Sequence, residues 1–193
     1  MKNDTWIKEQ VKTNEMIKPF VDHTVREADG KKVLSYGLSP SGYDLRLQDE
    51  VFVESGHVIS GMSIDPKNKK TINRDGLMVR EDENGRYVVV PPKSPFWAST
   101  VERLKMPRSV SGFVLPKSSY ARCGIEVINP LIDAGWEGNL TIACVNTSQH
   151  PMRVYLNEGF CQLCLFDVGE CEVSYDERGG LYQNAEGVMF TEV

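Results

Sequence analysis

Hydrophobic and polar residues alternate along most of the chain, which is the pattern of half-buried β-strands. The segment YDLRLQDEVFVES, residues 43–55, alternates in this way. The segment LMVREDENGRYVVVPP, residues 77–92, predicts a β-hairpin in which Asn84 and Gly85 supply the positive φ angles of a tight turn. Gly, Pro and Asn residues separate further strand-like segments: 96–107, 111–124, 137–148, 152–168 and 171–177. This spacing predicts a mostly-β sandwich or barrel rather than alternating β-α units.

The start of the chain has helical spacing instead. In NDTWIKEQVKTNEMI, residues 3–17, Asp4 or Thr5 is the expected N-cap and Pro19 ends the region. Four apolar residues follow the helical period in this segment: Trp6, Ile7, Val11 and Met16. We therefore expect an amphipathic helix within an N-terminal segment of residues 1–20.

The 193 residues are predicted to form one domain, because no internal repeat or low-complexity linker divides them. The C-terminal tail, residues 176–193, contains RGGLYQNAEGVMFTEV and has little periodicity. Such a tail can be a frayed end or a lid that becomes ordered over a ligand, and its composition favours fraying.

Charge and composition restrict the class of ligand. The net charge is −5, and the densest basic run is KNKK at residues 67–70, so binding to polymeric nucleic acid is not expected. An acidic chain can still bind a small phosphorylated ligand through a locally positive site. No apolar run is long enough to cross a bilayer, and the N-terminus lacks the apolar core of a signal peptide. We therefore predict a cytoplasmic protein without membrane association.

The cysteines and histidines give no sign of a metal or redox site. Five cysteines without a secretory context predict reduced thiols. Cys161 and Cys164 form a C-x-x-C pair, but in a strand their side chains point to opposite faces, as small hydrophobic residues in a sheet do. His23, His57 and His150 are widely separated and match no motif, so we expect surface or turn positions for them.

Five short segments resemble, in order, the motifs of the dCTP deaminase/dUTPase superfamily. SGYDLRL, residues 41–47, has the first motif's Gly-x-Asp-Leu, and LPKSSYARCGI, residues 115–125, has the second motif's serines and arginine. PLIDAGWEG, residues 130–138, resembles the third, and NEGFCQLCLF, residues 157–166, resembles the fourth, with its Gln. SYDERGGLYQ, residues 174–183, resembles the C-terminal segment of dCTP deaminases in particular, as do IKPF and VLSYGLSP near the N-terminus. The similarity to which these segments belong extends over most of the chain.

The resemblance implies a distorted β-barrel or jelly-roll subunit of the dUTPase-like type. It also implies a homotrimer with active sites between the subunits. The implied ligands are deoxypyrimidine nucleoside triphosphates, dUTP or dCTP, bound with Mg²⁺. Asp44 is the acid expected near the metal-bound phosphates, acting through water, because Mg²⁺ keeps several of its waters in proteins.

The same resemblance indicates which residues bind the nucleotide. The PKSSYAR turn offers hydrogen-bond donors and positive charge to a triphosphate, with Ser118 on a phosphate and Arg122 near the reaction. Gln162, a polar residue inside an apolar strand, is expected to donate to a phosphate or to orient a water. The segment before the third motif is expected to read the edge of the base, and Trp136 to pack beside the sugar. The expected nucleotide-binding residues are Lys117, Ser118, Ser119, Arg122, Ile128, Asp133, Trp136, Gln162, Tyr175, Arg178, Tyr182 and Gln183.

Asp133 is the expected catalytic acid. In dUTPases the Asp of the third motif activates the water that attacks the α-phosphate, and Asp133 matches that residue. A fixed carboxylate takes the proton of this water while cationic donors stabilise the developing phosphate charge. Many dCTP deaminases also have an acid at this position, so Asp133 alone does not separate the two activities.

Ala143 does separate them. dCTP deaminases carry a Glu in the strand after the third motif, where it moves protons during attack on C4 of cytosine, and this chain has Ala143 at that position. In NLTIACVN, strand alternation places Thr141, Ala143 and Val145 on one face and Ile142 and Cys144 on the other. A methyl group cannot transfer protons, so the position is inert toward deamination.

Three explanations fit Ala143. The chain has lost deamination and kept dUTP hydrolysis, or it is a dCTP deaminase whose Glu was replaced by design, or it binds nucleotide without turnover. The tail favours natural divergence, because deaminases usually have Lys and Gln where this chain has Leu181 and Ala185, and Arg178 is the nearest cationic replacement. We therefore predict hydrolysis of dUTP to dUMP and pyrophosphate. The alternatives are dCTP deamination and sequestration of nucleotide by a non-catalytic trimer.

Overall fold

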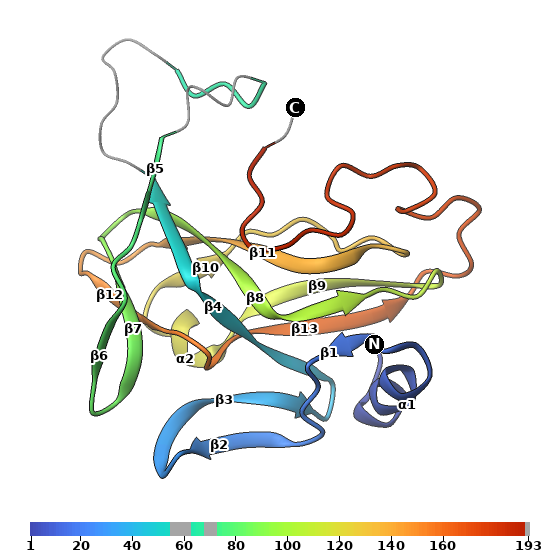
Figure 1. Cartoon of the computed structure of the whole chain (residues 1–193), viewed down its shortest axis with the longest axis horizontal. Helices are drawn as coiled ribbons and strands as arrows, with labels where there is room; N and C mark the ends of the chain where they lie inside the picture. Colours follow the sequence, from blue (N-terminus) through green and yellow to red (C-terminus); the bar gives the residue numbers. More distant parts are fainter. Residues whose placement is uncertain (55–62, 68–72, 192–193) are drawn as a thin grey trace.

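The computed structural model describes residues 1–54, 63–67 and 73–191, and two β-sheets account for most of them (Figure 1). Among these residues, ten strands form the larger sheet: β1 (Ile17–Lys18), β2 (Thr24–Ala28), β3 (Lys31–Ser39), β4 (Gly42–Glu54), β5 (Arg74–Gly76), β8 (Pro95–Lys105), β9 (Val110–Pro116), β10 (Ile125–Val127), β11 (Glu137–Asn146) and β13 (Gly159–Asp167). The smaller described sheet contains β6 (Arg80–Asp82), β7 (Gly85–Val90) and β12 (Met152–Tyr155). The described helices are α1 (Asp4–Asn14) and α2 (Ser118–Ala121). The predicted mostly-β class with an N-terminal helix is confirmed.

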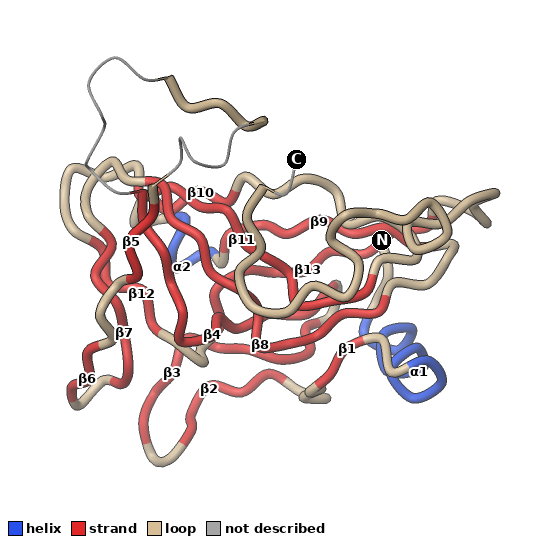
Figure 2. Tube along the Cα trace, turned by 45° about the horizontal axis from the view of Figure 1, so that its top comes forward, coloured by secondary structure: helices blue, strands red, loops and turns tan. Residues whose placement is uncertain are grey.

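The larger sheet is antiparallel, and its central path runs β10-β11-β8-β4-β13-β9. The long strand β4 pairs with β13 through residues 43–46 and with β8 through residues 47–53. The register with β8 shifts between Leu47 and Val51, and such an irregularity bends and twists a strand. Strand β4 therefore crosses the molecule from β5 to β3 and links the two halves of the distorted barrel, as Figures 1 and 2 show.

The core lies inside this curved sheet. Phe160 is fully buried at its centre, where its ring centroid lies 6.2 Å from that of Phe96 and 4.9 Å from that of Tyr120. Tyr43 is also fully buried, and its hydroxyl oxygen accepts a hydrogen bond of 3.1 Å from the backbone N–H of Val21. Burial raises the pKa of Tyr43 to about 12, so this phenol stays protonated as part of the core.

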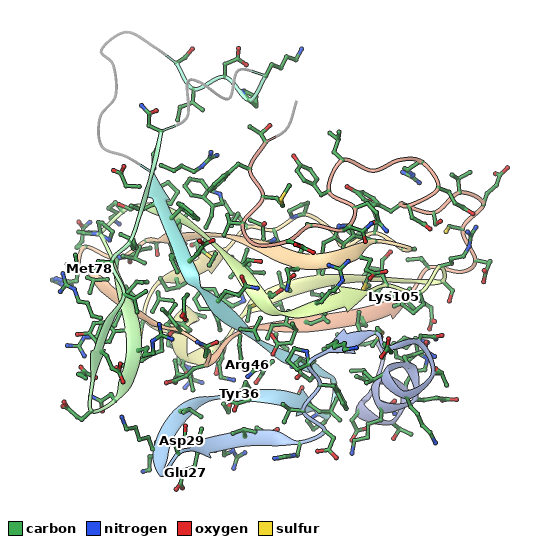
Figure 3. All side chains as sticks on the ribbon, in the orientation of Figure 1. Glu27, Asp29, Tyr36, Arg46, Met78 and Lys105 are labelled. Carbon is green, nitrogen blue, oxygen red and sulfur yellow. The ribbon has the colours of Figure 1, made fainter. Side chains whose placement is uncertain are left out.

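One ion pair is buried where β4 and β8 meet. The backbone N–H and the Nε of Arg46 donate to the two carboxylate oxygens of Glu102, at 2.9 and 2.7 Å. The Glu102 side chain is 0% exposed, and the guanidinium of Arg46 lies 4.7 Å from the ring centroid of Tyr36 (Figure 3). Desolvation raises the pKa of Glu102, while its bonds to Arg46 act in the opposite direction. The carboxylate of Glu102 on β8 therefore binds β4 through the side chain and backbone of Arg46.

Helix α1 has the predicted position but a different N-cap. The side chain of Asn3 accepts a 3.1 Å hydrogen bond from the backbone N–H of Trp6, and Asp4 is the first helical residue. The prediction of Asp4 or Thr5 as the cap is therefore wrong by one or two residues, because Asn3 has the extended backbone that an N-cap needs. Ile7 is fully buried and anchors the helix to the sheet.

The predicted hairpin at residues 77–92 is present as β6 and β7, with a different turn. Asp82 pairs with Gly85, so Glu83 and Asn84 form the turn. Gly85, at the first position of β7, has a φ of 130°, and Asn84 does not share the positive φ that we predicted for it. The backbone N–H of Asn84 instead donates to the Asp82 side chain at 2.9 Å, as in an Asx-turn.

Two other segments differ from their predicted structure. Residues 171–177 form turns rather than a strand, because Ser174 bonds locally to the side chains of Asp176 and Glu177. Such bonds compete with strand pairing. Residues 111–124 contain β9 followed by the short helix α2, where we expected only strand and turn.

All five cysteines are free, in agreement with the sequence. His57 and residues 68–70 of the KNKK run lie outside the described residues. Among the described residues, no helix has the length and apolar character needed to cross a bilayer.

Candidate functional site

A pocket of about 470 Å³ lies between β8, β11, the loop before β11 and the C-terminal tail. It brings together the residues that the sequence analysis assigned to the chemistry, Asp133 and Ala143, and three of the aromatic residues assigned to the nucleotide, Trp136, Tyr175 and Tyr182. In both views the tail runs beside β11 (Figures 1 and 2). The remaining lining residues are Trp97, Asn129, Pro130, Leu131, Ile132, Asn139, Leu140, Thr141, Ala185 and Met189.

Asp133 stands in the loop between β10 and β11. The loop is fixed on one side by Ile132, which is buried and exchanges backbone hydrogen bonds of 2.7 and 3.0 Å with Gly112. It is fixed on the other side by Ala134 and Trp136, which are also buried. Asp133 itself is exposed, and its carboxylate forms no ion pair with a described residue. The loop thus holds an unpaired carboxylate at the rim of the pocket.

Ala143 lies on β11 with its methyl group toward the pocket. Residues 141, 143 and 145 of this strand are half-buried, whereas Ile142 and Cys144 are buried, so the predicted alternation is confirmed. Asn129 fixes the backbone of β11 on both sides of this position. Its Oδ1 accepts from the backbone N–H of Ala143 at 2.9 Å, and its Nδ2 donates to the backbone carbonyl of Thr141 at 2.6 Å. The backbone N–H of Ile128 donates to the carbonyl of Ala143 at 2.9 Å. The side-chain amide of Asn129 is therefore committed to β11.

The C-terminal tail is docked on β11 and is not frayed over residues 176–191. The indole N–H of Trp136 donates to the carbonyl of Tyr182 at 2.8 Å. Gln183 bonds to its own chain with both ends of its amide, accepting from Glu137 at 3.1 Å and donating to Gly135 at 3.3 Å. Further along, the backbone N–H of Met189 donates to the hydroxyl of Thr141 at 2.8 Å. In this arrangement the Gln183 amide is occupied by protein rather than by a ligand.

Charged residues hold the beginning of the tail. Arg108, in the turn between β8 and β9, donates to the carboxylate of Glu177 and to the carbonyl of Cys171. The hydrogen bond from Arg108 lowers the pKa of Glu177 to about 2, so this carboxylate stays ionised at any ordinary pH. Arg178 is exposed and donates to the carbonyl of Val173 at 3.2 Å, and it does not line the pocket.

The residues expected to bind phosphate form a second group around α2. Lys117 is paired with Asp44 at 2.6 Å, and the two side chains are only 12% and 13% exposed. Gln162 lies directly opposite Asp44 in the sheet, and its amide donates to the hydroxyl of Ser39 at 3.2 Å. Ser118, Ser119 and Arg122 are exposed on and after the short helix.

A hollow of about 460 Å³ adjoins this second group. It is lined by Lys117 and Ser119 together with Arg26 and Lys32 from the β2–β3 hairpin. The sequence analysis missed Arg26 and Lys32, because no local motif marks a hairpin cation that folds toward a distant turn. Arg26 and Lys32 bring positive charge to this hollow, which the acidic Glu27 also lines.

The two groups do not meet within one chain. The pocket with Asp133 and Ala143 shares no lining residue with the hollow at Lys117 and Ser119. In both views α2 lies away from the tail (Figures 1 and 2). The two groups of predicted site residues therefore lie at two separate places on this chain.

The described residues do not build a magnesium site by themselves. No group of three His, Cys, Asp or Glu side chains among them is arranged to hold a metal ion. Asp44, the predicted acid, is already paired with the ammonium group of Lys117. A cation at that point would have to be held mainly by oxygens that a ligand brings.

This chain is similar to known proteins in sequence and in fold. A family model described as dCTP deaminase-like matches residues 1–168. A dCTP deaminase of Burkholderia mallei (strain SAVP1) is 42% identical over 190 residues, which are 97% of this chain and 96% of that protein. The crystal structure of a dCTP deaminase from Agrobacterium tumefaciens matches 85% of this chain with a TM-score of 0.57 and 18% identity, and this chain spans 46% of that one. A dUTPase of Staphylococcus bacteriophage 80alpha matches 81% of this chain and 84% of its own, with a TM-score of 0.46 and 14% identity.

Proposed function

This chain belongs to the dCTP deaminase-like family of nucleotide enzymes, and from that membership we propose that it hydrolyses dUTP to dUMP and pyrophosphate. One observation carries the proposal. Asp133 is the single acidic side chain among the described residues that line the pocket, and the position that would carry a deaminase Glu is the methyl group of Ala143. The pocket thus has a base for a water molecule and nothing to move protons at a ring carbon.

The chemistry follows from these two residues. An ionised Asp133 accepts a proton from water, and the hydroxide character that results is directed at the α-phosphorus. Cationic and hydrogen-bonding groups then stabilise the charge that develops on the phosphate oxygens. We assign the stabilisation of this phosphate charge to five residues: Lys117, Ser118, Ser119, Arg122 and Gln162. Mg²⁺ enters with the triphosphate as part of the substrate, bound to phosphate oxygens.

A second copy of the chain is needed to complete this site, because the phosphate group and the pocket lie apart on one subunit. Large apolar side chains beside Asp133 support such an assembly. Ile128 is 59% exposed and Leu131 is 51% exposed, and exposed apolar residues at the rim of a site commonly mark an interface. We therefore propose a homotrimer in which each site takes Asp133 from one subunit and the phosphate-binding residues from its neighbour.

The oligomeric state checks this part of the proposal. Light scattering after size exclusion is expected to give three times the 21.7 kDa of the chain. The mass should not change when dUTP and Mg²⁺ are added, because the subunits are expected to associate without ligand. A monomer that releases pyrophosphate from dUTP would contradict the shared site.

Product analysis tests the reaction itself. The protein is incubated with dUTP or dCTP and Mg²⁺, and pyrophosphate and ammonia are measured separately. We expect pyrophosphate from dUTP and no ammonia from dCTP, because Ala143 cannot transfer a proton. Ammonia from dCTP with the chain as it is, or no product together with tight binding of dUTP, would overturn the proposal in favour of deamination or of nucleotide sequestration.

The substitution Ala143→Glu distinguishes deamination further. If the remainder of the pocket were still built for a cytosine nucleotide, this change alone would restore ammonia release from dCTP. Under our proposal it gives no ammonia, because the tail also departs from the deaminase pattern, at Leu181 and Ala185.

A further inference from the structure

The residue paired with Ala143 across the sheet is Trp97. In the antiparallel ladder between β8 and β11, Ala143 stands directly opposite Trp97, and both residues line the pocket. Directly opposed side chains lie on the same face with their Cβ atoms about 4.5–5.5 Å apart. Residue 143, the position expected to face the cytosine ring in dCTP deaminases, therefore has the indole of Trp97 beside it in this chain.

The neighbours of Trp97 close its other side. On β4, the residue opposite Trp97 is Phe52. The ring of Phe190, from the tail, meets Trp97 edge to face at 6.2 Å and Phe52 at 5.3 Å. Large aromatic groups thus pack on the β4 side of the indole, while the single methyl of Ala143 stands on the β11 side. Trp97 stays half-buried and lines the pocket.

Arg74 holds the indole in this position. Its guanidinium lies 4.8 Å from the Trp97 ring centroid and 3.8 Å from that of Phe190. The Nε of Arg74 is buried and has no hydrogen-bond partner among the described residues, so ring contacts hold the guanidinium at this end. Burial lowers the pKa of Arg74, and an arginine side chain in a protein keeps its charge. A cation packed between two rings restricts both of them.

The indole N–H of Trp97 has no hydrogen-bond partner in the part of the chain that the structure describes. Among the described residues no acceptor bonds to it, in contrast to the other indole of the pocket, Trp136, whose N–H is bonded to Tyr182. Asn129, a polar residue that lines the same pocket, is committed to β11 at both ends of its amide. Trp97 is consequently an uncommitted donor next to Ala143.

We propose that Trp97 selects the base: its N–H donates to the C4 oxygen of uracil, and its ring fills the space beside Ala143 in which a water would attack C4. The inference rests on the proposed function, which places C4 of the pyrimidine at position 143. Uracil presents a carbonyl acceptor at C4, whereas cytosine presents an amino group that is itself a donor. Two donors that face each other leave both unpaired, and a site built for one hydrogen-bonding pattern rejects the other strongly.

The binding of non-hydrolysable nucleotides tests whether Trp97 selects the base, without turnover. The probes are α,β-imido-dUTP and α,β-imido-dCTP with Mg²⁺, titrated calorimetrically into the full-length protein. The wild-type chain is expected to bind the uracil probe at least about 10-fold more tightly, the effect of one satisfied against one unsatisfied buried donor. In Trp97→Phe, which keeps a ring but lacks the N–H, this preference is expected to fall to about threefold or less, mainly through weaker binding of the uracil probe.

Matched controls separate a lost contact from a damaged fold. Trp6→Phe makes the same change on helix α1, away from the pocket, and should leave the preference at its wild-type value. A probe carrying sulfur in place of the C4 oxygen needs no substitution in the protein. Because sulfur is a weak acceptor, this probe should bind the wild-type chain several-fold less tightly than the oxygen probe, and that difference should disappear in Trp97→Phe.

The outcomes distinguish this inference from the function on which it rests. If Trp97→Phe keeps the full preference for uracil, or if the wild-type chain binds both probes equally, Trp97 does not select the base. The proposed function survives either result as long as dUTP still yields pyrophosphate. If the wild-type chain binds neither probe, both the inference and the proposed function fail.

Discussion

Asp133→Asn is expected to slow the release of pyrophosphate from dUTP by a factor of about 10²–10⁴, the usual contribution of a general base. Asparagine has nearly the same shape as aspartate but does not accept the proton of an attacking water at neutral pH. Asp133 is exposed and forms no ion pair with a described residue, so the change removes a reactive group and no structural contact. The rate is measured as pyrophosphate formed with dUTP and Mg²⁺ at saturation.

Binding measured alongside shows whether Asp133 acts in the reaction or only in recognition. The affinity of the variant for α,β-imido-dUTP is expected to stay within about threefold of the wild type, because a group that acts in the transition state contributes little to the ground state. Asp4→Asn, on helix α1, provides a matched control that should keep the wild-type rate. An Asp133→Asn variant that releases pyrophosphate at the wild-type rate would remove the central acid from the mechanism.

Features that depend on neighbours in the sequence could be predicted well. The alternation on β11, the helix at residues 4–14 and the hairpin of β6 and β7 all follow from periods of 2 or 3.6 residues. Their ends were less predictable, because competing local hydrogen bonds decide them. Asn3 rather than Asp4 caps the helix, and Ser174 bonds to nearby carboxylates where the pattern suggested a strand.

Features that depend on distant pairing could not be predicted. Trp97 has no motif of its own, and only the register between β8 and β11 places it opposite Ala143. The bond from Trp136 to Tyr182 likewise joins the third motif to the tail, which composition alone presented as a frayed end. The resemblance supplied Asp133 and Ala143 as candidates, and the fold placed both at one pocket.

Breaking the buried ion pair between β4 and β8 is the substitution with the largest expected effect on stability. Glu102→Ala leaves the guanidinium and backbone N–H of Arg46 without their carboxylate, in a place where the Arg46 side chain is only 15% exposed. Removing one partner of such a pair usually costs about 3–5 kcal/mol, because an uncompensated charge stays buried. The free energy of unfolding is measured in urea at one protein concentration, since an oligomer's stability depends on concentration.

A double variant shows whether Glu102→Ala loses stability because the charge of Arg46 is left unpaired or because side-chain volume is removed. Glu102→Leu combined with Arg46→Met removes both charges and keeps apolar groups of similar size, so most of the lost stability should return. Asp49→Ala breaks the ion pair between Asp49 and Arg86, two side chains that are each 44% exposed. A much smaller loss in the free energy of unfolding is expected for this variant. If Glu102→Ala and Asp49→Ala lower the free energy of unfolding by the same amount, Arg46 can reach water. In that case the ion pair does not hold β4 between β8 and β13. If the double variant is no more stable than Glu102→Ala, packing around the carboxylate, rather than its charge, holds the two halves of the barrel together.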